Sequence, residues 1–286
     1  MKLAFVQLLF LAFAAKADLA VDYLDHLSEL HGKDLKANYT ASCECTAKMT
    51  ACGLDSMCRS NLECDMGCAG DVKCQLACTY SYMSPTLDDL DHCLFVDPGC
   101  WDLPKPSPLN NATCREPTKT VADIDAELLG GTWYVVKGFN PLYDCFDCQV
   151  QYFSVDGANV TYSAYFNMLA SNGSEMWPNI TATGEDVSVP GQIIYDREEN
   201  GLPDHQVWYI LHLSEDTLIG YYCGNVLDSW HFEGLIVMSR TFELNADRED
   251  DLAQILVDLG MTDDELCHLT PEQYCPAQTG TGIFLQ

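Results

Sequence analysis

Cysteine is the most prominent residue type in this sequence that could do chemistry. The chain of 286 residues contains 16 cysteines, and two pairs are spaced four positions apart: Cys64 with Cys68, and Cys74 with Cys78. Residues at positions i and i+4 share one face of a helix. The spacing therefore predicts two short helices, joined by a turn near residues 69–71 and held face to face by disulfides.

The other reactive side chains do not indicate a metal site. Cys145 and Cys148 have the spacing of a zinc or redox pair, but structural disulfides are the more common use of such cysteines in an oxidising compartment. The segment 196–201 begins like a calcium loop, yet Val207 occupies the twelfth position, where a bidentate glutamate is required. The histidines are scattered without metal-ligand spacing. We therefore expect no bound metal.

Residues 1–17 are typical of a secretory signal peptide. Lys2 precedes an apolar run that ends in Ala15-Lys16-Ala17, a small-x-small cleavage pattern. Five Asn-x-Ser/Thr acceptor sites suit a glycosylated chain of the secretory pathway, and they begin at Asn38, Asn111, Asn159, Asn172 and Asn179. In that compartment most of the cysteines should form disulfides.

The net charge restricts the partners of the chain. Lys and Arg number 14 against 43 Asp and Glu, which gives a formal charge of −29. Such a chain repels nucleic acid phosphates and anionic lipids, so we expect no nucleic acid partner. Acidification toward the carboxylate pKa of roughly 4 removes much of this self-repulsion.

Composition divides the rest of the chain into segments. Residues 18–42 form an acidic linker or helix, and a disulfide-stapled helical domain spans 43–114. Prolines between residues 101 and 118 mark a linker. Strand-like runs then follow one another without helices between them, which predicts an antiparallel barrel or sandwich over 120–245. The runs are 132–136, 150–154, 160–166, 192–196, 207–213, 217–222 and 234–239.

The last segment, 246–286, is predicted to contain a helix and a tail. Leu252, Leu256 and Leu259 share one helical face with Ile255, so the helix could pack against the outside of a barrel. The tail contains Cys267 and Cys275, which we expect to pair with each other.

Several motifs resemble those of the violaxanthin de-epoxidase family. Residues 131–149 read Gly-Thr-Trp-Tyr-Val-Val-Lys-Gly-Phe-Asn-Pro-Leu-Tyr-Asp-Cys-Phe-Asp-Cys-Gln, which begins with the lipocalin signature Gly-x-Trp and continues like the opening of that family's barrel. Trp208-Tyr209-Ile210-Leu211, Tyr221-Tyr222 and Ser239-Arg240-Thr241 match as well. With the cysteine spacings from 43 to 100, the resemblance covers about residues 43–245.

The resemblance implies a mainly β fold, an eight-stranded lipocalin-like barrel preceded by a small disulfide-rich helical domain. It implies removal of epoxide oxygens from a xanthophyll such as violaxanthin or diadinoxanthin, with ascorbate as reductant. It further implies a location in the thylakoid lumen of an algal plastid. It also implies an acid-induced homodimer and contact with the thylakoid membrane surface at low pH. The extracellular or endomembrane space is the alternative location. A disulfide between Cys100 and Cys148 is implied in the same way.

Some positions depart from the family pattern. Gln206 and Val207 stand where family enzymes have an acidic pair, Cys145 replaces an alanine, and Cys223 replaces an arginine. We expect the two cysteines to form a local disulfide at the barrel mouth. These departures suit a violaxanthin de-epoxidase-like member better than the plant-type enzyme.

Opening an epoxide needs a proton donor, usually a carboxylic acid whose pKa is raised by an apolar pocket. With the acidic pair absent, Asp204 is the first candidate and Asp147 or His205 the next; the alternative for Asp204 is a surface loop aspartate. By carry-over, Tyr222 would assist by hydrogen bonding and Gln149 would orient a polyol such as ascorbate. Trp208 would line the substrate site or belong to the core.

Two other functions fit the same sequence. A lipocalin interior can hold a carotenoid or other long apolar ligand without chemistry. An epoxide isomerase would need an acid but no reductant. The lost acidic pair favours these alternatives.

Overall fold

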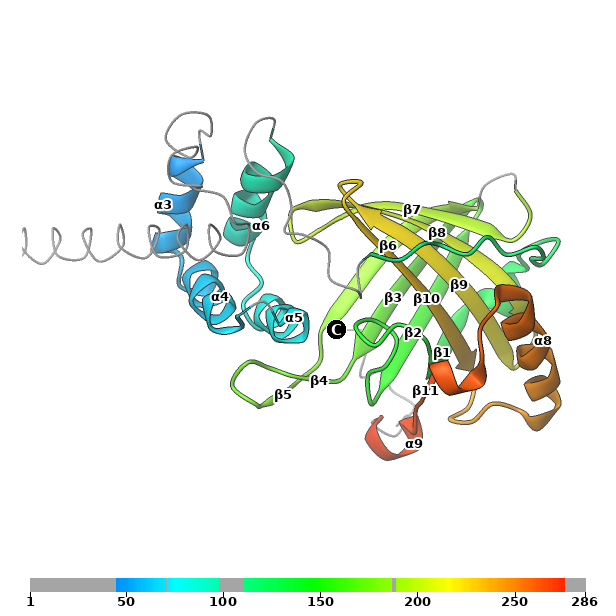
Figure 1. Cartoon of the computed structure of the whole chain (residues 1–286). Helices are drawn as coiled ribbons and strands as arrows, with labels where there is room; N and C mark the ends of the chain where they lie inside the picture. The colour runs from blue at the N-terminus through cyan, green and yellow to red at the C-terminus, as the bar shows by residue number, and fades with distance from the viewer. Residues whose placement is uncertain (1–44, 70, 98–110, 187–188, 276–286) are drawn as a thin grey trace, which may run out of the picture. The chain divides into compact units, whose positions relative to one another are not determined.

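The computed structural model of the chain describes residues 45–69, 71–97, 111–186 and 189–275. The chain forms two compact units, one with the helices of its N-terminal part and one with the sheet (Figure 1). The expected signal peptide, the segment 18–42 and Cys100 lie outside the described residues. Within the described ranges, no helix has the length and apolarity needed to cross a membrane.

The helical unit is built from short helices, three of which have a side chain that caps their start. Asp55 and Asp71 accept hydrogen bonds from backbone amides in the first turns of α4 and α5, and Ser84 does so for α6, which begins with Pro85. Such caps satisfy amides that no helical carbonyl can reach. The elements are α3 (Thr46–Leu54), α4 (Ser56–Gly67), α5 (Val72–Ser81), α6 (Pro85–Asp91) and the π-helical turn η1 (His92–Val96).

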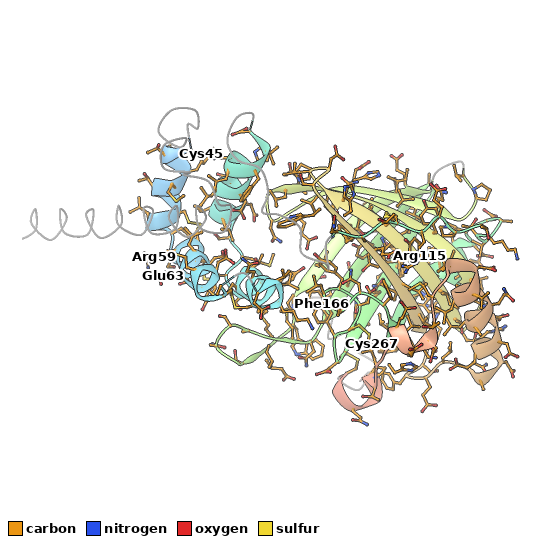
Figure 2. The ribbon with its side chains drawn as sticks, in the orientation of Figure 1. Cys45, Arg59, Glu63, Arg115, Phe166 and Cys267 are labelled. Atoms are coloured by element: carbon orange, nitrogen blue, oxygen red, sulfur yellow. A yellow bond between two sulfur atoms is a disulfide. The ribbon has the colours of Figure 1, made fainter. Side chains whose placement is uncertain are left out.

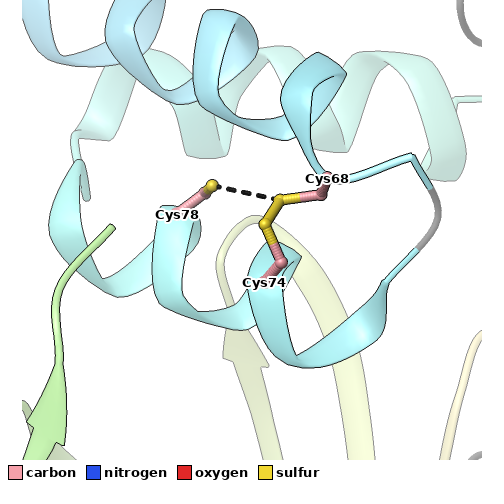
Figure 3. A group of neighbouring side chains, drawn as sticks. All are labelled: Cys68, Cys74 and Cys78. Atoms are coloured by element: carbon pink, nitrogen blue, oxygen red, sulfur yellow. Dashed lines mark hydrogen bonds between the residues drawn. A yellow bond between two sulfur atoms is a disulfide. The ribbon is translucent and has the colours of Figure 1, made fainter. Parts of the chain in front are cut away.

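Two adjacent disulfides join α4 to α5. The bridges are Cys64–Cys78 and Cys68–Cys74, so the cysteines spaced four apart do staple two helices to each other. Figure 3 shows the Cys68–Cys74 bridge beside Cys78, the partner of Cys64. The Sγ atoms of Cys68 and Cys78 lie 3.5 Å apart. The sulfur cluster of this unit is therefore a pair of disulfides rather than a set of thiolate ligands.

The remaining described disulfides of this unit enclose a small core. Cys45 is joined to Cys93, and Cys52 to Cys58. Leu62, Leu90 and Leu94 are buried between these bridges, and Figure 2 labels Cys45 at the start of α3. The core is too small to hold the unit alone, which explains the density of disulfides.

The sheet unit is a closed antiparallel barrel. The strands follow the order β10-β9-β8-β7-β6-β3-β2-β1-β11, and β10 pairs back to β1. Because β11 (Cys267–His268) only adds two residues beside β1, eight strands form the barrel, and the predicted fold class is confirmed. They are β1 (Gly131–Gly138), β2 (Gln149–Asp156), β3 (Asn159–Phe166), β6 (Asn179–Asp186), β7 (Gln192–Glu199), β8 (Leu202–Leu213), β9 (Thr217–Val226) and β10 (Trp230–Ser239). A small hairpin, β4 (Met168–Leu169) with β5 (Glu175–Met176), lies between β3 and β6 in the sequence.

Strand β6 is the one barrel strand that the sequence pattern does not predict. Its inward side chains include only Ile180 and the small Ala182, whereas Thr181 and Thr183 face β3 on the outside, where their hydroxyls make hydrogen bonds. The bulky apolar alternation that signals a strand is therefore missing.

One end of the barrel is closed around Trp133. Its buried indole Nε1 donates to the carbonyl of Leu129, at the end of α7 (Ala126–Leu129), over 2.7 Å. The guanidinium of Arg240, after β10, lies 3.6 Å from the centre of the Trp133 ring and donates to the carbonyls of Leu128, Gly130 and Thr132. The first and last motifs of the family pattern therefore meet at this end.

Helix α8 (Glu249–Leu259) packs on the outside of the barrel, as its periodicity predicts. Leu252, Leu256 and Leu259 are buried against outward side chains of β1, β9 and β10. The 3₁₀ turn before it is η3 (Ala246–Arg248), and η4 (Asp263–Glu265), β11 and α9 (Pro271–Tyr274) follow it. Lys137 of β1 secures this region, since its Nζ lies 3.0 Å from both Glu249 and Asp263.

The C-terminal cysteines do not pair with each other. Cys145 is bonded to Cys267, and Cys148 to Cys275, so the expected Cys267–Cys275 and Cys100–Cys148 bridges are wrong. The cause is β11, which pairs with the end of β1 and so brings the tail beside the loop that follows β1. Cys267 is labelled in this region in Figure 2.

The expected bridge between Cys145 and Cys223 is also wrong. Cys223 is bonded to Cys114, a residue of the sequence-defined segment 43–114. Cys223 packs with the outward side chains of β9. The segment around Arg115 (Figure 2) runs along that outer face, since the amide of Arg115 donates to the hydroxyl of Tyr221 over 2.7 Å. Cys145, in contrast, lies in the loop after β1, with its Sγ 3.9 Å from the carbonyl oxygen of Gly138.

Candidate functional site

A carboxyl group and a tyrosine meet inside the barrel, at the end where β1 finishes, away from Trp133. Asp144 is fully buried, and Tyr222 is 3 % exposed. The Tyr222 hydroxyl donates to Oδ1 of Asp144 over 2.7 Å, and the amide of Asn140 donates to Oδ2 over 2.8 Å. Asp144 belongs to the loop after β1 and Tyr222 to β9, so closure of the barrel is what brings them together.

Two glycines provide the space that this pair occupies. A Cβ atom at Gly138 of β1 would collide with the backbone and Cβ of Asp144, and one at Gly234 of β10 would collide with the ring and hydroxyl of Tyr222. Any larger residue at either position would displace one member of the pair.

The loop that carries Asp144 is held by Asn140. The Asn140 side chain donates from Nδ2 to the carbonyl of Glu233 over 2.9 Å, and its Oδ1 accepts from the amide of Leu142 over 2.9 Å. Its carbonyl accepts from the amide of Asp144 over 2.8 Å. The carboxyl group is therefore positioned by the backbone before any ligand arrives.

Burial raises the pKa of Asp144 to about 7, although hydrogen bonds from Tyr222 and Asn140 act in the opposite direction. Burial also raises the pKa of Tyr222 well above its usual range, and the neighbouring Asp144 charge adds to this effect. The pair can thus present a neutral carboxylic acid at acidic pH, next to a hydroxyl that remains protonated.

Aromatic rings continue from this pair through the barrel. The Trp208 ring stacks on Tyr222, with centroids 5.3 Å apart and planes inclined by 19°. The ring centroids of Tyr162 and Tyr195 lie 5.6 and 5.9 Å from that of Trp208. The ring centroid of Phe232 lies 6.2 Å from that of Tyr222. An interior of this kind suits a flat apolar ligand.

Asp204, the acid that the sequence favours, is also buried in the barrel but is engaged by other groups. Its Oδ2 accepts from Nε of Arg197 and from Nε2 of Gln206, both over 2.7 Å. Gln206 in turn accepts from the Trp208 indole over 3.0 Å. A carboxylate paired with a guanidinium accepts hydrogen bonds rather than donating a proton. The Asp204 carboxylate is thus held between Arg197 and Gln206.

The other predicted site residues divide between the two faces of the sheet. Gln149 is buried at the start of β2, and Trp208 is buried in the barrel core. His205 alternates to the outer face of β8, where its Nδ1 lies 2.6 Å from an oxygen of Asp196. Asp147 is exposed. The structure thus brings neither His205 nor Asp147 to the buried pair.

Asp144 is the buried carboxyl group of this candidate site that the sequence analysis did not single out. The available signal is its place between Tyr143 and Cys145 in the motif that follows the first strand. Nothing in that spacing shows that the loop turns inward, because its partner Tyr222 lies 78 residues away.

The comparison with protein families gives one match over most of the chain. The model described as "VDE lipocalin domain" matches residues 39–270. A violaxanthin de-epoxidase, chloroplastic, from Nicotiana tabacum is 25 % identical over 253 residues, which are 84 % of this chain and 49 % of the relative. Its counterpart from Arabidopsis thaliana is 25 % identical over 208 residues, 69 % of this chain and 44 % of the relative. The chain thus spans less than half the length of these relatives.

Solved lipocalin structures show a distant likeness. A bovine lipocalin allergen, Bos d 2, aligns with a TM-score of 0.42 at 11 % identity, covering 54 % of this chain and 99 % of the allergen. An odorant binding protein, OBP1, aligns with a TM-score of 0.42 at 13 % identity, covering 54 % of this chain and 97 % of that protein.

Proposed function

Since the chain belongs to the VDE lipocalin domain family, we propose that it binds a xanthophyll or similar long apolar ligand in its barrel and removes an epoxide oxygen, with ascorbate as reductant. The single observation that carries this proposal is the buried hydrogen bond between Asp144 and Tyr222. The aromatic interior around Trp208 supports the apolar part of the ligand.

Asp144 supplies the proton that epoxide opening needs. An acid with a pKa of about 7 is protonated at acidic pH and loses its proton readily when a stronger acceptor forms, which suits a general acid. Tyr222 keeps its proton and can transfer its hydrogen bond from Asp144 to the epoxide oxygen. We propose that Gln149 orients the reductant.

The overall reaction balances with one ascorbate for each epoxide. Two C–O bonds break, a C=C bond forms between the two carbons, and the oxygen leaves as water. The change consumes two electrons and two protons, which ascorbate supplies as it becomes dehydroascorbate. Asp144 gives its proton to the oxygen first and is protonated again before the next turnover.

The setting that we propose is an acidified plastid lumen, reached through the secretory pathway. The relatives are named chloroplastic, and the signal-like residues 1–17 support the route. With a formal charge of −29, acidification would weaken repulsion between copies and from a membrane surface. An acid-induced homodimer at the thylakoid surface is therefore part of the proposal.

Epoxide isomerisation is the second candidate, and the state of Asp204 favours it. Gln206 and Val207 replace the acidic pair, and Asp204 is ion-paired with Arg197, which leaves Asp144 as the acid of the interior. An isomerisation moves the oxygen within the ligand and needs a proton but no electrons.

The deciding experiment is an assay on the oxidised mature protein. Violaxanthin and diadinoxanthin are incubated at acidic and neutral pH, with and without ascorbate, and pigments are followed by chromatography. We expect loss of the epoxide only with ascorbate and acid. An isomer formed without ascorbate would establish the second candidate. Pigment retained through gel filtration without turnover would leave a carotenoid-binding lipocalin.

A further inference from the structure

A two-residue segment on the outside of the barrel is attached to β9 on both sides of Tyr222. Cys114 is bonded to Cys223, and the amide of Arg115 donates to the hydroxyl of Tyr221 over 2.7 Å. Side chains alternate along a strand, so Tyr221 and Cys223 pack on the outer face while Tyr222 belongs to the interior. We call Cys114 and Arg115 the outer clasp, because they hold β9 at the position of the Tyr222 side chain.

The Arg115 side chain extends the outer clasp to β10. Its guanidinium donates to Oε1 of Glu233, a residue that is only 8 % exposed. Oε2 of the same carboxylate accepts from the hydroxyl of Tyr221 over 2.7 Å. Glu233 is followed by Gly234, which stands opposite Tyr222 in the β9–β10 register. The ion pair therefore joins the two strands directly beside the candidate site.

The outer clasp is also linked to the loop that carries Asp144, along two routes. The carbonyl of Glu233 accepts from Nδ2 of Asn140 over 2.9 Å, and the Asn140 amide donates to the Asp144 carboxyl group over 2.8 Å. On the second route, the guanidinium of Arg115, labelled in Figure 2, lies 5.3 Å from the centre of the Phe139 ring, in the residue before Asn140. Arg115 is thus linked to both members of the buried pair from the opposite face of the sheet.

The close packing inside the barrel makes the buried pair sensitive to small movements of these strands. A Cβ atom at Gly234 would collide with the Tyr222 ring, so the ring lies directly against the backbone of β10. An ion pair as buried as that of Glu233 contributes little net stability, because the cost of desolvating the charges offsets their attraction. Its consequence lies in geometry, since the Glu233 carboxylate accepts hydrogen bonds from two groups and is fixed in direction.

We propose that Arg115 is a positioning residue for the buried pair of acid and tyrosine. Through its ion pair with Glu233, it holds β9, β10 and the Asp144 loop at the spacing that the buried hydrogen bond requires. The inference rests on the proposed function for the reaction that the pair performs, but the geometry that it describes exists without a ligand. It gives a role in the chemistry to a residue that precedes the predicted barrel segment 120–245.

Steady-state kinetics of the oxidised mature protein test this role. In Arg115→Met the backbone amide and the Cys114–Cys223 bridge remain, but the ion pair is lost. We expect kcat for epoxide conversion at acidic pH to fall about tenfold with KM within about twofold, because the acid is displaced while the ligand-binding interior is kept. Arg115→Lys keeps a positive charge beside Glu233 and should recover kcat to within about threefold of the unaltered protein.

Infrared spectroscopy measures the buried pair without any turnover. The C=O stretching band of protonated Asp144 is recorded below its pKa of about 7 and is identified by its absence in Asp144→Asn. In Arg115→Met the band should move to higher wavenumber, because the hydrogen bonds to the carboxyl group become longer and weaker. In Arg115→Lys it should return toward its original position.

Arg248→Met is the matched control. Arg248 also forms ion pairs outside the barrel, with Asp216 and Asp251, and its side chain is 33 % exposed against 29 % for Arg115. Asp216 precedes β9, at the end of the barrel where Trp133 lies. Arg248→Met should therefore leave kcat and the infrared band unchanged, whatever its effect on the unfolding temperature.

Glu233→Gln keeps the test open if Arg115→Met does not fold. It replaces the carboxylate by a neutral side chain of the same shape, so we expect kcat to fall about two- to fivefold and the band to move in the same direction.

The other outcomes separate this proposal from the proposed function. An unshifted infrared band in both Arg115→Met and Glu233→Gln would overturn the proposal whatever their rates, as would an equal loss of kcat in Arg248→Met. Absence of turnover in the unaltered protein would overturn the proposed function instead, and the infrared band alone would then decide whether Arg115 positions the pair.

Discussion

At the scale of the single residue, the chemistry that we propose depends on the buried acid Asp144. Asp144→Asn keeps the shape of the side chain but removes the proton, so we expect epoxide conversion to fall by about 10²-fold or more with ligand affinity nearly unchanged. Chromatographic rates and fluorescence titrations measure the two effects.

Two neighbouring aspartates serve as comparisons for that variant. Asp147 lies in the same loop and is exposed, so Asp147→Asn should leave the rate within twofold, a range of about 0.4 kcal/mol. Asp204→Asn should lower the rate less than Asp144→Asn does, because Asp204 is linked to Tyr222 only indirectly, through Gln206 and Trp208. Full activity in Asp144→Asn would refute the assigned acid.

The same residue should make stability depend on pH. Its pKa of about 7 in the folded state exceeds the unfolded value of about 4, so the folded protein binds more protons between these limits. The free energy of unfolding should therefore fall as pH rises from about 4 to 7, by roughly 4 kcal/mol at most. Urea denaturation across this range should show a smaller fall in Asp144→Asn. Equal pH slopes in the two proteins would contradict the raised pKa.

At the scale of elements, substitutions in α8 test how much packing on the outer face of the barrel contributes to stability. Leu256 is 3 % exposed against the barrel and Val257 is 70 % exposed. Leu256→Ala leaves a cavity and should lower the free energy of unfolding by about 2–4 kcal/mol, whereas Val257→Ala should change it by less than about 0.5 kcal/mol. Chemical denaturation measures both, and similar losses in the two variants would mean that α8 does not pack as described.

The end of β1 is the element on which the candidate site depends most. Gly138 accommodates the Asp144 loop, and the bridges Cys145–Cys267 and Cys148–Cys275 tie this loop and the start of β2 to the C-terminal tail. The position of the acid is thus determined jointly by β1, β9 and a tail more than 100 residues further along the chain.

At the scale of the whole molecule, the described disulfides do not cross between the two units. Each unit has its own buried core, and the barrel unit contains Cys114–Cys223, Cys145–Cys267 and Cys148–Cys275. A fragment of residues 111–286, produced under oxidising conditions, should therefore fold alone and unfold in one cooperative transition.

Circular dichroism and peptide mapping without reductant would test that fragment. We expect a β-type spectrum, a sigmoidal melt and the three barrel disulfides in the stated pairing. A fragment that shows no cooperative melt although the three bridges are present would show that the barrel requires the N-terminal half.

Local periodicity and local composition are what the sequence by itself determined about this protein. Cysteines four apart lie on one face of α4 and α5, and Leu252 and Leu256 lie on the buried face of α8. Short runs rich in Val, Ile, Tyr and Trp, separated by turn residues, predicted seven of the eight barrel strands. The threonine-rich strand β6 has few bulky apolar residues, so the sequence did not predict it.

Only the tertiary structure decided which distant residues meet. The partners of Cys145 and Cys223, the pairing of Asp144 with Tyr222 and the engagement of Asp204 by Arg197 all depend on strand register and on closure of the sheet. Residue type and spacing do not encode these long-range contacts directly. A shift of one residue in strand register would turn every side chain of that strand to the other face. The acid of the site therefore became identifiable once the barrel was closed.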